Sequence, residues 1–193
     1  MNTPNKLTIA RIIATPFFMA ALMIEFPFHY TVALILFIAA SLTDMIDGKM
    51  ARKYNMITDF GKFLDPLADK MLTTAAFLGF IKMGIGWQVT WIAFIVLFRE
   101  FLISSLRLVV VSSGGKVIAA NMWGKCKTVS QMAGIILALF AYVLISDFGI
   151  NNGVLVSVCN IIISILFWAS AVLCIISGVI YLKDSKEYID PSK

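Results

Sequence analysis

Long apolar segments alternate with short polar ones along this chain. Six stretches of mostly apolar residues can be drawn, each near the ~20 residues that an α-helix needs to cross the hydrocarbon core of a bilayer. Their approximate bounds are Leu7–Ile24, Thr31–Ala51, Gly61–Lys82, Trp87–Val110, Thr128–Ile145 and Val154–Leu182. The connections are short, apart from the stretch Val111–Lys127. The pattern predicts an all-α, polytopic integral membrane protein with six transmembrane helices in a single domain, residues 1–193.

The composition agrees with this interpretation. Of the 193 residues, 60% are apolar and 14% are charged, and the mean hydropathy is +0.91. Soluble domains normally contain about one quarter charged residues, so the chain is too hydrophobic for that class. The three cysteines have no CxxC spacing, which argues against a disulfide framework or a zinc site.

The net charge of +5 is unevenly distributed. Most lysines and arginines, Arg11 among them, fall at the segment ends that share a side with the N-terminus, whereas the opposite loops hold a single lysine. Cytoplasmic loops of membrane proteins carry such an excess of basic residues. We therefore expect a multi-pass protein of the cell membrane, in contact with membrane lipids, with both termini in the cytoplasm. The basic charge then needs no nucleic-acid partner, and none is expected.

Four aspartates, Asp44, Asp47, Asp65 and Asp69, lie in the second and third apolar segments. A carboxylate within a bilayer costs several kcal/mol or more unless a cation meets it. Helical spacing places the first two on one face of their helix and the last two on one face of the next. The short loop between the two segments predicts antiparallel neighbours, so the pairs would face each other across a cleft open to the cytoplasm.

Such a set of carboxylates predicts a two-metal site that handles a pyrophosphate. Hard oxygen ligands suit Mg²⁺ or Mn²⁺, and two such ions stabilise an in-line displacement at phosphorus. Gly48, Ala51 and Gly61 keep the surrounding surface low, so that a bulky polar ligand can approach. Arg52 can donate two hydrogen bonds to a phosphate or a base edge. The alternative is structural, with aspartates that cap helices or pair with Arg52 or Lys53.

A family resemblance rests on these residues. The string D-x2-D-G-x2-A-R-x8-G-x3-D-x3-D is matched at every fixed position, by Asp44, Asp47, Gly48, Ala51, Arg52, Gly61, Asp65 and Asp69. It resembles the signature of the CDP-alcohol phosphotransferases, integral membrane enzymes of phospholipid biosynthesis. The resemblance implies that family's fold, with six transmembrane helices, a cytoplasmic active site and commonly a homodimer. It also implies transfer of a substituted phosphate from a CDP-linked donor to an alcohol, with release of CMP.

The resemblance further implies roles for single residues. Asp44, Asp47 and Asp65 would hold two divalent cations on the pyrophosphate of CDP-diacylglycerol. Asp69 would contact a metal and act as general base for the acceptor hydroxyl. The cytidine pocket would be lined by Gly48, Ala51, Arg52 and Gly61.

Basic residues in the later segments suggest the acceptor. Arg99 and Arg107 interrupt the fourth segment, and Lys125 and Lys127 come at the start of the fifth. Together they could bind an acceptor that itself carries a phosphate, such as glycerol 3-phosphate or inositol phosphate. Two structural alternatives stay open: Arg99 could form an ion pair with Glu100 or an aspartate, and Arg107 could extend its side chain to the membrane surface.

Three shorter segments resemble the phosphatidylglycerophosphate-forming branch of the family. They are Pro4–Arg11, Leu64–Lys70 and Arg99–Leu102. The reaction then expected joins CDP-diacylglycerol and sn-glycerol 3-phosphate to give phosphatidylglycerophosphate and CMP. The alternative within the family is the same chemistry with inositol phosphate or phosphatidylglycerol as acceptor. A cation transporter is the remote alternative from another class, because intramembrane aspartates also bind transported ions.

Overall fold

We analysed a computed structural model of the chain. It describes the backbone of residues 2–53, 58–85, 88–112, 122–150 and 152–186. Within these ranges, the side chains of residues 3, 45, 47–53, 59–60 and 62–63 are not described.

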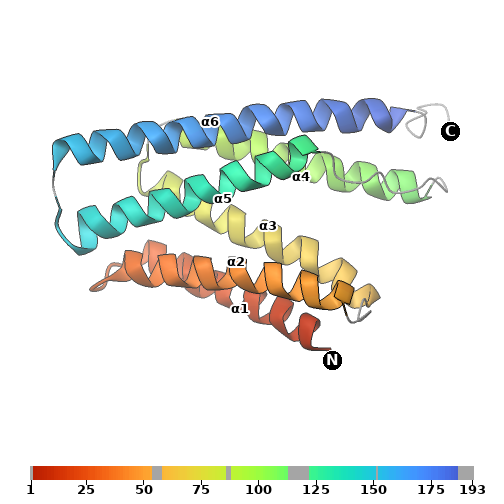
Figure 1. Cartoon of the computed structure of the whole chain (residues 1–193), viewed down its shortest axis with the longest axis horizontal. Coiled ribbons are helices and arrows are strands. Elements are labelled where there is room, and N and C mark those ends of the chain that lie inside the picture. The colour runs from red at the N-terminus through yellow and green to blue at the C-terminus, as the bar shows by residue number, and fades with distance from the viewer. Residues whose placement is uncertain (1, 54–57, 86–87, 113–121, 151, 187–193) are drawn as a thin grey trace. The chain divides into compact units, whose positions relative to one another are not determined.

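The described part of the chain is helical and contains no strand, which confirms the all-α prediction (Figure 1). The helices are α1 (Thr3–Met23), α2 (His29–Lys53), α3 (Asp59–Lys82), α4 (Gln88–Ser112), α5 (Met122–Tyr142), which continues as the short π-helix η1 (Val143–Asp147), and α6 (Gly153–Asp184). Each α-helix coincides with one predicted segment. The fifth begins earlier than expected, so that Lys125 and Lys127 lie in the first turns of α5.

Three stretches in the described residues are long and apolar enough to cross a membrane. They are Pro4–Met23, Met122–Asp147 and Gly153–Asp184. The stretch His29–Asp44 is a shorter apolar helix. The chain therefore has the character of a membrane protein, and the number of six crossings stays a prediction.

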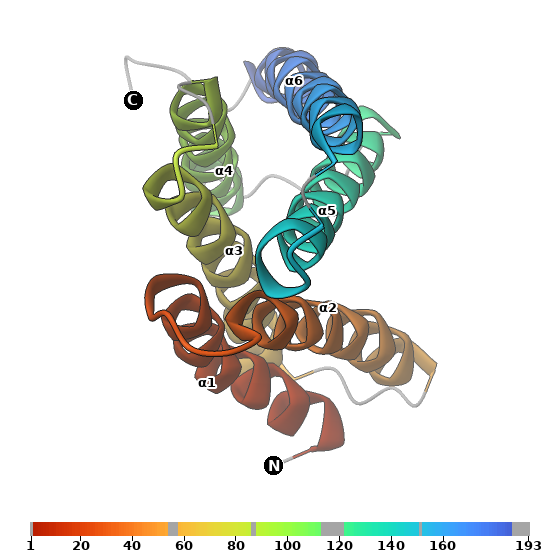
Figure 2. The same ribbon diagram turned by 90° about the vertical axis from the view of Figure 1, so that its left-hand side faces the viewer.

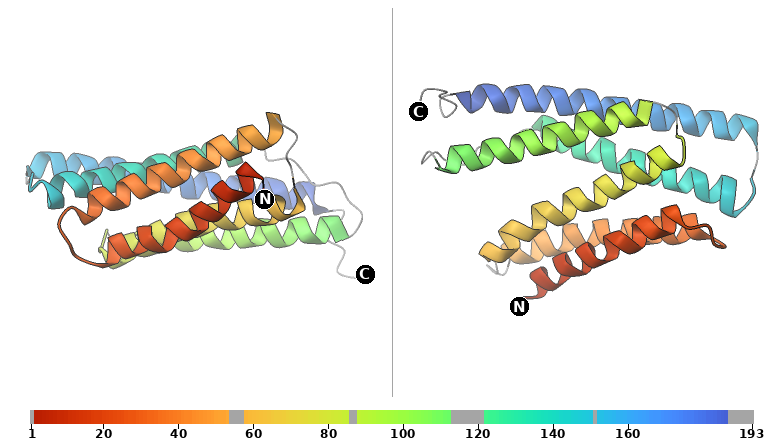
Figure 3. Two further views of the ribbon diagram at one scale, coloured as in Figure 1. Left: turned by 90° about the horizontal axis from the view of Figure 1, so that it is seen from below. Right: turned by 180° about the vertical axis from the view of Figure 1, so that it is seen from behind.

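The chain folds as two compact units. Unit 1 comprises Met1–Gly86 and Ile135–Asn160, and unit 2 comprises Trp87–Gly134 and Ile161–Lys193. In unit 1, α1 packs along both α2 and α3 (Figure 1, Figure 2). The turn that joins α1 to α2 is visible from two further sides in Figure 3. Direct contact between α2 and α3 is sparse by comparison, so α1, and not α3, is the principal neighbour of α2.

Helix α1 buries a polar stripe and exposes apolar side chains. Ile13 and Phe17 are 56% and 63% exposed, as expected of side chains that meet lipid. The buried polar residues of α1 are Asn5, Thr8, Arg11 and Thr15. Their spacing of three, three and four residues places them on one face of the helix. In a membrane, polar side chains face the interior of the protein, and this stripe is therefore directed at α2 and α3.

Helices α5 and α6 approach closely in unit 2 at a glycine. A Cβ atom added at Gly134 would lie 2.7 Å from two ring carbons of Phe167, a ring that is 1% exposed. Nearer the start of α4, the Gln88 side-chain amide donates a 2.7 Å hydrogen bond to Ser164 Oγ on α6. The missing side chain at residue 134 thus lets a large buried ring fill the contact between the two helices.

We expect Gly134→Ala to destabilise the protein, because the new methyl group has to displace the buried Phe167 ring. Overpacking of this kind costs about 1–3 kcal/mol. The measurement is the thermal unfolding midpoint of the purified protein in detergent. Gly153→Ala is the matched control, since a Cβ there meets no atom within 4 Å. Equal midpoints for both variants would contradict the close α5–α6 contact.

Candidate active site

The start of α3 is fixed by side chains from two elements of unit 1. Thr58 caps the helix, because its Oγ1 accepts a 3.0 Å hydrogen bond from the Gly61 backbone N–H. The Asn5 side-chain amide donates a 3.0 Å hydrogen bond to the same Thr58 Oγ1. A cap and a residue of α1 therefore set the start of the helix that carries Asp65 and Asp69.

Gly61 has a structural role that the sequence did not reveal. A Cβ atom at this position would lie 2.9 Å from Asn5 Oδ1 and 3.2 Å from Thr58 Oγ1. The first distance is shorter than real Cβ contacts and the second is tighter than most, so a side chain here would displace Asn5 or Thr58. The glycine therefore lets α1 lie against the first turn of α3, whatever further part it takes in ligand binding.

Asp44 of α2 is paired with a buried arginine of α1. Arg11 Nη1 donates a hydrogen bond of 2.5 Å to Asp44 Oδ1, and Arg11 Nε donates one of 3.2 Å to the Ala40 carbonyl. The Arg11 side chain is 1% exposed, whereas that of Asp44 is 47% exposed. The guanidinium of Arg11 therefore lies inside unit 1. Arg11 does more than supply the basic charge that the sequence predicts at the cytoplasmic end of its helix.

Asp65 of α3 is held by a different residue of the same stripe. Its Oδ1 lies 2.7 Å from Thr8 Oγ1, which also lies 3.2 Å from the Pro4 carbonyl oxygen. A hydroxyl has one hydrogen to donate, and the shorter contact with a charged acceptor is the stronger one. Thr8 is 1% exposed, but the carboxylate that it binds is exposed.

Asp69 follows Asp65 by four residues on α3 and is also exposed. Its backbone carbonyl accepts a 3.1 Å hydrogen bond from Thr73 Oγ1, one turn further along the helix. The i, i+4 spacing places both carboxylates on one face of α3, as predicted.

The described residues include only part of the predicted metal site. Among them, no three His, Cys, Asp or Glu side chains gather closely enough to hold an ion. The backbone of Asp47 lies in α2, but its side chain lies outside the described residues. The donor chemistry of the described part fits a divalent cation, since Asp44 and Asp65 are accessible carboxylates and hard oxygen ligands suit Mg²⁺ or Mn²⁺.

The predicted cytidine pocket falls mostly on side chains that are not described. The backbones of Gly48, Ala51 and Arg52 lie in the last turns of α2. The assignment of these residues to a nucleotide site therefore stays a prediction.

Comparison with known proteins identifies the family. The family model described as CDP-alcohol phosphatidyltransferase matches residues 1–176. The chain belongs to the CDP-alcohol phosphatidyltransferase family.

Three relatives carry the name CDP-diacylglycerol–glycerol-3-phosphate 3-phosphatidyltransferase. The protein from Rickettsia bellii is 38% identical over 191 residues, which are 97% of each chain. The one from Haemophilus influenzae is 35% identical over 186 residues, 96% of this chain and 94% of the relative. The one from Bacillus subtilis is 42% identical over 146 residues, 69% of this chain and 74% of the relative.

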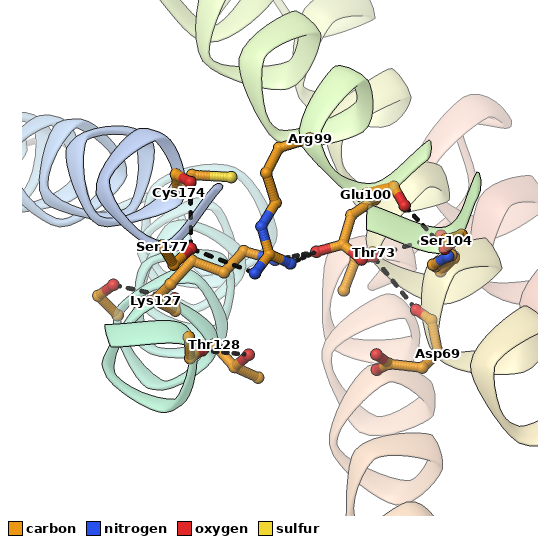
Figure 4. A network of polar contacts seen from close by, with 12 residues as sticks. Asp69, Thr73, Arg99, Glu100, Ser104, Lys127, Thr128, Cys174 and Ser177 are labelled. Carbon is orange, nitrogen blue, oxygen red and sulfur yellow. Dashed lines mark hydrogen bonds and ion pairs between the residues drawn. The ribbon is translucent and has the colours of Figure 1, made fainter. Parts of the chain in front are cut away.

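A second polar cluster of this CDP-alcohol phosphatidyltransferase lies in unit 2, around Glu100 (Figure 4). Glu100 Oε1 accepts a 2.5 Å hydrogen bond from Lys127 Nζ and one of 3.1 Å from Arg99 Nη1. Arg99 Nη2 also donates a 3.2 Å hydrogen bond to Ser177 Oγ on α6. The ion pair between Arg99 and Glu100 that the sequence left open is therefore present.

This cluster has unused hydrogen-bonding capacity. Its ion pairs among the described residues join one carboxylate, that of Glu100, to two cations. Arg99 Nε and the side-chain oxygen of Gln131, one turn beyond Lys127 on α5, are buried without a hydrogen-bond partner in the described part of the chain. Buried polar atoms without a partner are uncommon in proteins and call for an explanation. Arg107 and Lys125 are the other two residues predicted to bind the phosphate of the acceptor substrate, and both are exposed.

Sequence reasoning missed Asn5 and Thr8 as parts of the unit 1 cluster, and it considered Glu100 only as a possible ion-pair partner of Arg99. All three lie in segments that the sequence resemblance singled out, but their contacts with Thr58, Asp65 and Lys127 were not predicted. The signal for the first two was available, because polar residues at helical spacing in an otherwise apolar helix indicate a face directed at the protein interior.

Proposed function

We propose that this chain transfers the phosphatidyl group of CDP-diacylglycerol to sn-glycerol 3-phosphate, forming phosphatidylglycerophosphate and CMP. The observation that carries the proposal is the name CDP-diacylglycerol–glycerol-3-phosphate 3-phosphatidyltransferase, shared by relatives that are 34–42% identical over most of the chain. The aspartate signature across α2 and α3 agrees with this transferase chemistry.

In the proposed reaction, an acceptor hydroxyl oxygen attacks the phosphorus that bears diacylglycerol. A new P–O bond forms to the glycerol oxygen, and the bond from that phosphorus to the bridging oxygen breaks, so that CMP leaves with the bonding electron pair. The hydroxyl proton goes to Asp69, an exposed carboxylate on the same face of α3 as Asp65. Gly48, Ala51, Arg52 and Gly61 would line the cytidine pocket.

Asp44, Asp47, Asp65 and Asp69 would hold two divalent cations, Mg²⁺ or Mn²⁺. When bound, such ions neutralise charge on the pyrophosphate and polarise its P–O bonds. The carboxylate chemistry of the described residues supports this assignment.

The lipid substrate, CDP-diacylglycerol, also fits the position of the site in the chain. Its acyl tails stay in the bilayer while its nucleotide and the acceptor dissolve in water. A site near the cytoplasmic surface of a six-span protein of the cell membrane, with both termini in the cytoplasm, serves both. We include a homodimer in the proposal on the strength of the family resemblance.

The acceptor phosphate would bind Arg107, Lys125, Lys127 and Arg99. Support comes from the cluster in unit 2, where Arg99 and Lys127 outnumber Glu100 in charge. The partnerless Arg99 Nε and the partnerless Gln131 oxygen offer a donor and an acceptor to a polar ligand.

The acceptor is tested by offering the purified protein CDP-diacylglycerol with each candidate separately. We expect label from glycerol 3-phosphate to enter lipid, with one CMP released per product. Inositol phosphate and phosphatidylglycerol should give little product. Efficient use of another acceptor, without glycerol 3-phosphate transfer, would overturn the proposed substrate. Ion flux in proteoliposomes without CMP release would favour a transporter.

Asp69→Asn should abolish turnover, because an amide cannot accept the hydroxyl proton. We expect kcat to fall by at least about 100-fold, the lower end of the usual contribution of a general base. Binding of CDP-diacylglycerol should change little. Asp184→Asn, the same substitution at an exposed position near the end of α6, is the control and should leave kcat unchanged. Normal turnover in Asp69→Asn would exclude this residue as the base.

Arg107→Ala and Lys125→Ala should each raise the KM for glycerol 3-phosphate about tenfold, with a small change in kcat. A hydrogen bond to a charged group contributes about 1.5–3 kcal/mol, and 1.4 kcal/mol corresponds to a factor of ten. Lys186→Ala removes an exposed lysine outside the cluster and serves as the control. If neither variant changes this KM, these residues do not bind the acceptor phosphate.

A further inference from the structure

We propose that α1 belongs to the catalytic machinery, with Thr8 and Arg11 as positioning residues for the carboxylates that hold the divalent cations. This inference rests on the proposed function, because Asp44 and Asp65 are metal ligands in that proposal. It gives a role to the Pro4–Arg11 segment, no residue of which takes part in the proposed reaction itself.

The contacts from α1 converge on two proposed ligands that lie on different helices. Arg11 binds Asp44 of α2 through a charged contact of 2.5 Å, and Thr8 binds Asp65 of α3 through a neutral hydroxyl at 2.7 Å. Both donors come from one buried stripe of one helix. A purely structural ion pair would account for Arg11 but not for the hydroxyl that is directed at the second carboxylate.

Each of these two contacts uses a single oxygen of its carboxylate. Both Arg11 and Thr8 donate to Oδ1. A carboxylate has two oxygens, so Oδ2 is the atom that can coordinate a cation while Oδ1 is held. Donors that hold metal ligands in this way fix their orientation, and their loss typically costs 10–100-fold in metal affinity or activity.

The burial pattern fits positioning better than stabilisation. The donors Thr8 and Arg11 are 1% and 2% exposed, whereas Asp44 is half-exposed and Asp65 is exposed. Buried, well-packed donors thus hold acids whose second oxygen is open to an incoming ligand. Arg11 is further fixed by its bond to the Ala40 carbonyl and cannot easily follow its partner outward.

The test uses Thr8→Val, which keeps the shape of the side chain and removes its hydroxyl. Thr15→Val is the matched control: Thr15 lies on the same stripe and is 4% exposed, but in the described part of the chain its hydroxyl donates to the Arg11 carbonyl, at 2.9 Å, and not to a carboxylate. Thr8→Ser retains the hydroxyl and serves as the rescue variant. Binding of Mn²⁺ to the purified full-length protein, followed by electron paramagnetic resonance, reports on the site without any turnover.

We expect Thr8→Val to weaken Mn²⁺ binding by about tenfold or more, as for other donors that orient metal ligands. The Mn²⁺ affinity of Thr8→Ser and of Thr15→Val should stay within about threefold of the wild-type value, well below the roughly 10–100-fold loss typical when a donor that orients a metal ligand is removed. Arg11→Lys should weaken binding as well, because an ammonium group cannot contact both Asp44 and the Ala40 carbonyl with the same planar geometry. If Arg11→Lys does not fold, Thr8→Val alone decides.

Wild-type Mn²⁺ affinity in Thr8→Val, in a protein that is active with glycerol 3-phosphate, would overturn the positioning role and leave the proposed function intact. Equal losses in Thr8→Val and Thr15→Val would also overturn it, since the effect would then come from packing of α1. A wild-type protein that forms no lipid product with any acceptor would instead refute the proposed function.

Discussion

Two aspartates of unit 1, Asp44 of α2 and Asp65 of α3, each bind a hydrogen-bond donor, and both donors come from α1. Arg11 meets Asp44 and Thr8 meets Asp65. The rest of unit 1 follows from these two contacts. Helix α1 has to lie between the helices that carry the acids, its polar face has to be buried, and its apolar face has to meet lipid. Gly61 permits the close approach that brings Asn5 against the cap of α3.

The positions of the helices could be predicted from sequence, because in a membrane protein a long apolar run between polar residues has few structures open to it other than a helix. The aspartate signature identified the family for a related reason: eight fixed positions at set spacings are more specific than any composition. The pairing of helices could not be predicted in the same way. A short loop made α2 and α3 candidates for direct neighbours, but loop length says nothing about a third helix that binds both.

A single charged residue near a helix end can have more than one role in a membrane protein. A basic residue near the cytoplasmic end of a helix satisfies the positive-inside rule whether it faces water or an acid. From the sequence, Arg11 therefore served only to indicate the cytoplasmic side of the chain. The polar stripe around it nevertheless indicated a helix face directed at the protein interior. Arg99 illustrates the same ambiguity, since its ion pair with Glu100 and a role towards the acceptor are compatible. Glu100 accepts hydrogen bonds from both neighbouring cations, and the role of these cations towards a ligand stays a prediction.

Charge balance gives a reason why an arginine should lie beside the four aspartates of the proposed metal site. In the proposed complex, four aspartates and the two negative charges of a pyrophosphate diester meet two divalent cations, which leaves two negative charges uncompensated. Arg11 supplies one positive charge beside Asp44, and in the proposal Arg52 of the signature would supply another. The Arg11 guanidinium is fixed by its bond to the Ala40 carbonyl, so that it can hold Asp44 in place while the charge on the substrate changes during the proposed transfer.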